Sequence, residues 1–158
     1  ARFIARRIVI FASEDVGMAD PHALQVAVAA AHAVEHVGLP EAQLNLAQAV
    51  IHCATSPKSN RAALAIWNAR ADVRNGVLGE VPAHLRDAHY SGAQKIGHGA
   101  GYEYPHDHDA GIGLGGWVDQ DYLPPELAGR HWYEPSEHGN EAAVAQRLAE
   151  RRRGTEQP

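Results

Sequence analysis

The stretch DPHALQVAVAAAHAVEHVG, residues 20–38, indicates the fold class most directly. Asp20 and Pro21 form a helix start, because aspartate can cap free N–H groups and proline loses no hydrogen bond at the first helical position. Gly38 can end the helix. Apolar side chains occupy more than half of its circumference, so neighbours must cover several sides. The small alanine side chains would let a neighbouring helix approach closely. The candidate oligomer interface on this helix is Ala23, Ala27, Ala30, Ala31 and Val34.

The rest of the first half repeats this helical pattern, and a last helix is predicted near the end of the chain. Apolar residues recur at intervals of three and four, and helix-start and helix-stop residues separate the segments. Gly17 and Gly76 are natural C-terminal stops. The additional helices are expected at residues 2–16, 41–55, 60–75 and 140–153.

Two of these helices have a predicted buried face. In residues 41–55 a narrow polar stripe opposes a set of apolar side chains, and in residues 60–75 the apolar positions follow the spacing i, i+3, i+4, i+7, i+11. The first buried face is expected to be Leu44, Ala47, Val50, Ile51 and Ala54, and the second Ala62, Ala65, Ile66, Ala69 and Val73.

Residues 76–139 are rich in glycine and proline and are expected to be loops, with short helices near 91–97 and 125–129. The sequence therefore predicts an all-α fold: a compact helical domain of about five main helices with a long Gly/Pro-rich loop region. So long a loop region in a domain usually serves a function or is held by a partner.

Charge and composition argue against several classes of protein. The formal net charge of −5 leaves no global basic field for a nucleic-acid backbone. No apolar run reaches the roughly 18 residues of a membrane span, so no membrane partner is expected. The single cysteine, Cys53, excludes an internal disulfide framework and favours a reducing compartment. Its place within a helix predicts a small buried side chain.

The segment GYEYPHDHDAGIGLGGW, residues 101–117, could suggest a metal or a nucleotide. His106, Asp107 and His108 are suitable ligand types, so a small metal-dependent enzyme is one hypothesis, but their spacing does not fix a site geometry. The GxGxxG match at 111–116 has no apolar strand before it and prolines after it, which argues against dinucleotide binding. A polar loop explains the segment as well.

Four cationic residues are candidate anion or DNA contacts. Lys58 lies in SPKSN, just before a predicted helix whose N–H groups could also meet an anion. Structural capping by the same loop remains an open alternative. The candidates are Arg6, Arg7, Lys58 and Arg61.

Six separated motifs share one resemblance. FIARRIVIFASEDVGMADP (3–21), SPKSN (56–60), VPAHLRDA (81–88), GYEYPHD (101–107), YLPPEL (122–127) and WYEPSEHGNE (132–141) occur in this order. They resemble the C-terminal region of the replication-associated recombination protein A family. This is the bacterial RarA/MgsA group of AAA+ ATPases, related to the Werner-helicase-interacting ATPase of eukaryotes.

The resemblance implies a domain arrangement. Such proteins carry an N-terminal AAA+ module with Walker motifs, a helical lid and an all-α C-terminal domain that forms a homotetramer. Residues 1–17 would continue from the lid, residues 18–153 would form the C-terminal oligomerisation domain, and residues 154–158 would be a frayed tail. The motif GxxxxGK[ST] does not occur in the sequence. ATP and Mg are therefore expected in the N-terminal module, with no catalytic, cofactor-binding or metal-binding residue in this chain.

The resemblance also implies a role in DNA replication, recombination and repair at stalled forks in the cytoplasm. The expected partners are other copies of the chain, DNA through the full-length protein, and replication proteins such as single-strand-binding protein. Two alternatives to a tetramerisation domain stay open: a DNA- or protein-contact module of the same ATPase, and the metal-dependent enzyme.

Overall fold

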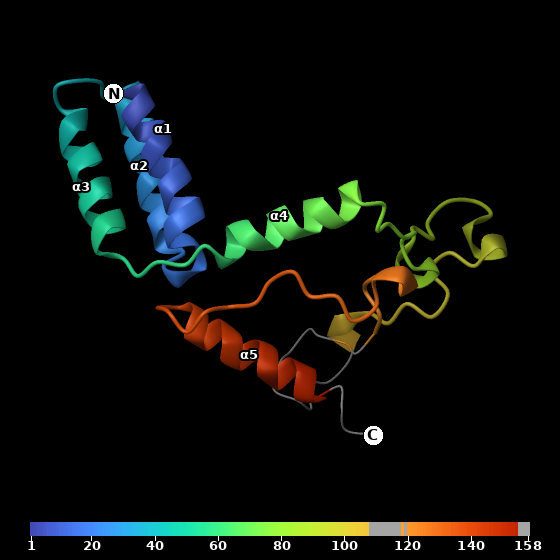
Figure 1. The fold of residues 1–158 in the computed structure, drawn as a ribbon. Coiled ribbons are helices and arrows are strands. Elements are labelled where there is room, and N and C mark those ends of the chain that lie inside the picture. The colour runs from blue at the N-terminus through green and yellow to red at the C-terminus, as the bar shows by residue number, and fades with distance from the viewer. Residues whose placement is uncertain (108–117, 119, 155–158) are drawn as a thin grey trace. The chain divides into compact units, whose positions relative to one another are not determined.

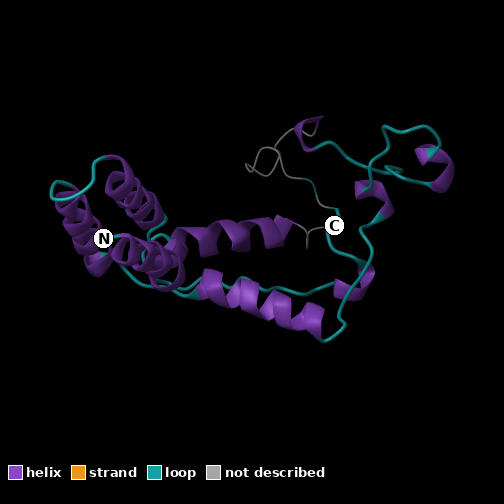
Figure 2. Cartoon of the chain, turned by 90° about the horizontal axis from the view of Figure 1, so that it is seen from above, coloured by secondary structure: helices purple, strands orange, loops and turns teal. Residues whose placement is uncertain are grey.

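The computed structural model describes residues 1–107, 118 and 120–154, and within them it contains five α-helices and no strand (Figures 1 and 2). The predicted all-α fold is confirmed, and the helix bounds agree with the sequence pattern to within about two residues except at the end of α1. The helices are α1 Arg2–Phe11, α2 His22–His36, α3 Ala42–Thr55, α4 Arg61–Arg74 and α5 Glu141–Gly154.

The predicted helix over residues 2–16 changes its geometry at Phe11. A π-helical turn follows over Ala12–Val16 and a 3-10 turn over Gly17–Ala19. Gly17 has φ +52°, which ends the helical run as predicted. Two short helical turns of different geometry therefore connect α1 to α2.

The chain divides into two units. The first contains Ala1–Arg70 together with His131–Leu148. The second contains Ala71–Arg130 and the chain from Ala149 onward. Its regular structure before Ala149 includes the 3-10 helices Ala83–Leu85, Ala93–Ile96, Pro105–Asp107 and Pro125–Leu127. The second and fourth confirm the short helices predicted near 91–97 and 125–129.

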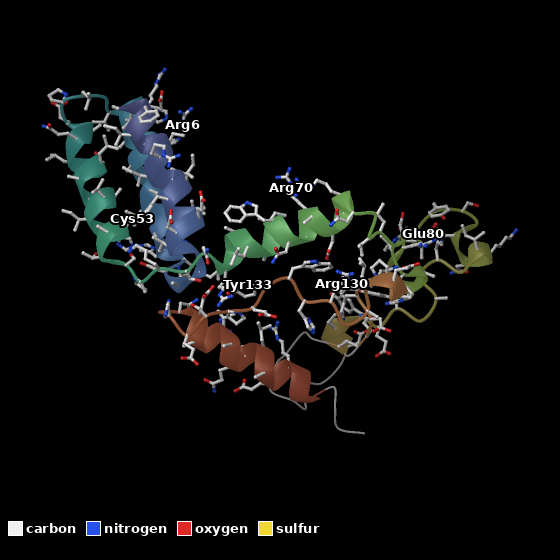
Figure 3. All side chains as sticks on the ribbon, viewed as in Figure 1. Arg6, Cys53, Arg70, Glu80, Arg130 and Tyr133 are labelled. Carbon is white, nitrogen blue, oxygen red and sulfur yellow. The ribbon has the colours of Figure 1, made fainter. Side chains whose placement is uncertain are left out.

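The core of the first unit is built from small side chains. Helix α2 packs against both α1 and α3 (Figure 1). Alanine at most contact positions lets the helix axes approach closely. Cys53 (Figure 3) is 3% exposed, which confirms its predicted burial. The core cluster is Ala5, Ile8, Ala12, Val16, Ala23, Ala27, Ala30, Leu46, Ala49 and Cys53.

The predicted buried face of α3 is wrong. Leu44, Val50 and Ile51 are 70%, 48% and 64% exposed. Helix α3 is apolar on more than one side, and the side with smaller residues fits against the alanine-rich α2. The buried residues of α3 are Ala42, Leu46, Ala49 and Cys53.

The predicted buried face of α4 is also wrong. No side chain of α4 is buried, and Ile66 and Val73 are both 56% exposed. Apolar spacing shows that a helix has an apolar face, but it does not show whether the same chain covers that face. None of the helices in the described ranges is both long and apolar enough to cross a membrane.

Candidate functional site

The first turn of α5 carries a fully buried carboxylate. Glu141 is 0% exposed, and it accepts hydrogen bonds from the hydroxyl groups of Ser59 (2.6 Å), Ser136 (2.5 Å) and Tyr133 (2.9 Å). The backbone N–H of Ser136 donates a fourth, at 2.8 Å. A buried charge is tolerated when its lone pairs are satisfied in this way.

These hydrogen bonds change the acidity of the groups that form them. Burial alone would raise the pKa of Glu141, but the hydrogen bonds from Ser136, Ser59 and Tyr133 outweigh it and lower that pKa. Burial, together with the hydrogen bond to Glu141 and its charge, raises the pKa of Tyr133 to about 12. Glu141 is therefore a structural anion surrounded by neutral donors.

Further hydrogen bonds join three segments around this carboxylate. The N–H of Ser59 donates to the carbonyl of Asp15 at 2.8 Å, and the N–H of Asn140 donates to the carbonyl of Ala19 at 2.8 Å. The imidazole Nδ1 of His138 lies 3.0 Å from the carbonyl oxygen of Lys58. Residues 15–20, 56–60 and 133–141 thus form one junction, which we call the Glu141 junction.

Two glycines allow the segments of the Glu141 junction to approach. A Cβ at Gly17 would lie 2.5 Å from the carbonyl oxygen of Ser59. A Cβ at Gly139, which has φ +53°, would collide with the carbonyl oxygen of Ala19 and with Pro57. Both positions require glycine for close backbone approach as well as for conformation.

A second polar cluster joins the start of α2 to the end of α3. The carboxylate of Asp20 accepts a hydrogen bond from the Ser56 hydroxyl (2.8 Å) and one from the N–H of His22 (3.1 Å). The Nε2 atom of His52 is 2.9 Å from the same carboxylate. Burial acts to raise the pKa of Asp20, but the bonds from Ser56 and His22 and the nearby His52 lower it overall. Asp20 therefore caps α2, as predicted, and also fixes α3.

Phe11 lines two hollows, and the first of them shares residues with the Glu141 junction. The basic hollow, of about 600 Å³, lies where α1, the loop before α4 and the first turn of α4 meet. The apolar hollow, of about 420 Å³, lies between α1 and α3. The basic hollow is lined by residues that include Phe11, Asp15, Lys58, Asn60 and Arg61, and the apolar hollow by residues that include Phe3, Ile4, Arg7, Phe11, Val50 and Ala54.

The structure brings together two of the four predicted anion contacts and places a third in the adjoining hollow. Lys58 and Arg61 line the basic hollow, and Arg7 lines the apolar hollow. Arg6 instead packs against Phe3, with its guanidinium carbon 5.4 Å from the ring centre. The ammonium group of Lys58 also donates hydrogen bonds to the carbonyls of Ala54 and Ser56 at the end of α3.

The residues of the predicted oligomer interface are buried or half-buried within their own chain. Ala23, Ala27 and Ala30 are buried in the core of their own chain, and Ala31 and Val34 pack partly buried against it. Their role in a subunit contact stays a prediction. The exposed apolar side chains are on other faces: Leu44 and Ile51 on α3, and Ile66 and Trp67 on α4, where Trp67 is 46% exposed.

The metal hypothesis falls mostly outside what is described. His108 is not among the described residues, and Asp107 ends a 3-10 turn. Nowhere in the described residues do three histidine, cysteine, aspartate or glutamate side chains gather as metal ligands would. The hypothesis on His106, Asp107 and His108 stays a prediction, because the side chains of both histidines lie outside what the structure describes.

Comparison with known proteins gives the family. A model of the MgsA AAA+ ATPase C-terminal region matches residues 1–152. The chain belongs to this family. It is 49% identical over 144 residues to replication-associated recombination protein A of Bacillus subtilis, which covers 90% of this chain and 33% of that protein.

Other relatives are similar over the same extent. The identity is 41% over 147 residues with replication-associated recombination protein A of Escherichia coli, which covers 93% of this chain and 32% of that protein. An AAA domain-containing protein of Mycobacterium tuberculosis is 54% identical over 147 residues. The match covers 93% of this chain and 31% of that protein. The chain spans about a third of the length of these relatives. The resemblance noted in the sequence is confirmed.

Sequence reasoning missed the Glu141 junction in this C-terminal domain. An acidic residue in the first turn of a helix is ordinarily a solvated partner of the helix dipole. The available signal was that SPKSN and WYEPSEHGNE are both among the stretches that carry the resemblance to the family. The structure shows that Ser59 of the first bonds directly to Glu141 of the second.

Proposed function

We propose that this chain is the tetramerisation domain of a AAA+ ATPase that acts in replication-fork maintenance and recombination. The observation that carries the proposal is the pair of uncovered apolar faces in the first unit. The outward face of α3 presents Leu44 and Ile51, and α4 presents Ile66 and Trp67.

These faces suit an interface better than open water. Fully burying a leucine or isoleucine side chain contributes roughly 1.5–3 kcal/mol. Every copy carries the same face, so a twofold axis brings two identical faces together and each residue contact occurs twice in the interface. A dihedral tetramer needs two different self-complementary contacts, and two separate apolar faces supply candidates for both.

The proposed domains outside this chain, and the activity of the full-length protein, are inferred from the family. Since the chain spans about a third of its relatives, ATP and Mg would bind in an N-terminal AAA+ module, and hydrolysis would take place there. The full-length protein would act on DNA in the cytoplasm and meet replication proteins such as single-strand-binding protein. The relatives from Bacillus subtilis and Escherichia coli are named for replication and recombination, which supports this role.

The test is the solution mass of the chain, measured by light scattering on a size-exclusion column over a range of concentrations. Four copies of the 17.0 kDa chain give 68 kDa. Replacing Leu44 or Ile51 by arginine should lower the mass, because a charge would enter an apolar contact. The matched control is Gln43→Arg, an exposed polar position on the same helix. A 17 kDa wild-type species at every concentration contradicts the proposal for this chain.

A further inference from the structure

Helix α4 ends on an asparagine that is followed by glycine. The chain has five asparagines, and Asn75 is the one whose next residue, Gly76, has no side chain. Both residues are exposed. A backbone nitrogen without a neighbouring side chain can reach the amide carbon of the preceding asparagine and close a five-membered ring. Sequence and exposure therefore place a reactive pair at this helix end.

The hydrogen bonds at the end of α4 determine when this pair can react. The N–H of Gly76 donates to the carbonyl of Val73 at 3.1 Å. The N–H of Val77 donates to the carbonyl of Asp72 at 3.0 Å. With φ +78° at Gly76, these two bonds form the Schellman motif that commonly closes a helix. Ring closure removes the N–H of Gly76, so the last turn of α4 must open before the reaction.

The last turn of α4 has little to hold it closed. No side chain of α4 is buried, and helix ends with few buried contacts open locally in a folded protein. The ion pair between Arg130 and Asp72, at 2.8 Å, ties this turn to a later part of the chain (Figure 3). A Cβ at Gly76 would meet no atom within 4 Å, so the ring has room to form.

We propose that Asn75 is a deamidation site of the folded chain, which converts through a cyclic imide with Gly76 to aspartate and isoaspartate. The backbone nitrogen of Gly76 attacks the side-chain carbon Cγ of Asn75 and gives its proton to water or hydroxide. The bond from Cγ to Nδ2 breaks, and the amide group takes up a proton and leaves as ammonia.

Water then opens the ring at one of two bonds of the Gly76 nitrogen. Cleavage of its bond to Cγ gives aspartate, and cleavage of its bond to the backbone carbonyl carbon of Asn75 gives isoaspartate. In total one water is consumed and one ammonia is released, and nothing is oxidised or reduced. The reaction needs no catalyst beyond the solvent.

Either product destabilises the end of α4. A negative charge at the C-terminus of a helix opposes the helix dipole, and the new carboxylate lies three residues after Asp72. Isoaspartate also adds a carbon to the backbone, so the two bonds of the Schellman motif no longer align. This inference goes beyond the proposed tetramerisation, which does not depend on Asn75, and the two can fail separately.

The test is incubation of the folded chain for days in mildly alkaline buffer, followed by ion-exchange chromatography and peptide mass mapping. A form one charge more negative than the formal −5 should accumulate, and an isoaspartyl methyltransferase should label the peptide that contains Asn75. Asn75→Gln should suppress this form, because glutamine would have to close a six-membered ring, which forms more slowly. The matched control is Asn68→Gln, an exposed asparagine of α4 followed by alanine, and it should behave like the wild type.

A second pair of variants tests the role of the helix end. Arg130→Gln removes the ion pair with Asp72 and should speed the conversion roughly twofold to fivefold, the range by which an exposed ion pair shifts an opening equilibrium. Arg70→Gln makes the same change of charge at another exposed position of α4 and should leave the rate unchanged (Figure 3). The proposal is overturned if the acidic form persists in Asn75→Gln, if only the urea-unfolded chain converts, or if Arg130→Gln converts no faster than Arg70→Gln.

Discussion

Replacing Glu141 by glutamine tests whether the buried carboxylate holds the Glu141 junction together. Glutamine has nearly the same shape, and its carbonyl oxygen can accept the bonds from Ser59 and Ser136 while its amide donates to Tyr133. The variant therefore keeps the contacts and removes the charge. Hydrogen bonds to charged groups contribute roughly 1.5–3 kcal/mol each, against roughly 0.5–1.5 for neutral ones.

The expected loss can be worked from the four bonds that Glu141 accepts. If all four hydrogen bonds weakened from the strength of charged bonds to that of neutral ones, the folded state would lose several kcal/mol. Part of this loss is offset because the variant no longer buries a charge. We expect a net decrease of about 2 kcal/mol in the free energy of unfolding. Urea unfolding followed by circular dichroism measures it. Glu137→Gln, an exposed neighbour, should change it by less than about 0.5 kcal/mol.

The pH dependence gives the same test a second readout. The pKa of Glu141 is lower in the folded protein, so its contribution is full above the ordinary pKa of the unfolded chain and is lost as the pH falls through the folded pKa. Glutamine does not titrate, so the difference between wild type and variant should shrink in acid. A glutamine variant that is as stable as the wild type at neutral pH refutes the reasoning.

Three other predictions follow from described contacts. Gly139→Ala should lower the free energy of unfolding by roughly 2 kcal/mol in urea melts, because its Cβ would meet Ala19 and Pro57; unchanged stability would contradict the close approach. Asp20→Asn should lose about 1 kcal/mol at neutral pH and little in acid, since the lowered pKa of Asp20 makes its contribution vanish as the pH falls; pH-dependent thermal melts check this. Burial raises the pKa of the Cys53 thiol, so a thiol reagent should modify it slowly in native buffer and rapidly in urea; fast native labelling would show that the core opens easily.

Local signals were sufficient to predict the helices, because their starts and stops depend on neighbouring residues. Gly17 ends the first helical run and Asp20 caps α2, both as the sequence indicates. The inward face of α3 could not be predicted this way. Apolar residues occur on several sides of that helix, and the choice depends on which side fits the alanines of α2.

The Glu141 junction could not be predicted for a different reason. Its partners Ser59 and Glu141 are 82 positions apart, and no spacing rule joins residues at that separation. The two hollows share this limit, because Phe11 and Arg61 become neighbours only when the loop before α4 folds back on α1. The candidate cations Lys58 and Arg61 are visible in the sequence, whereas their position beside Phe11 is not.

The separation between Ser59 and Glu141 also has a consequence for synthesis. A ribosome adds roughly 5–20 residues per second, so Ser59 emerges roughly 4–16 s before the carboxylate that it will bind. During that interval the nascent chain holds α1, α2 and α3, with the hydroxyl of Ser59 still in contact with water. The helical hairpins can dock early through local contacts, and the last closure of the unit must wait for the first turn of α5 to leave the exit tunnel.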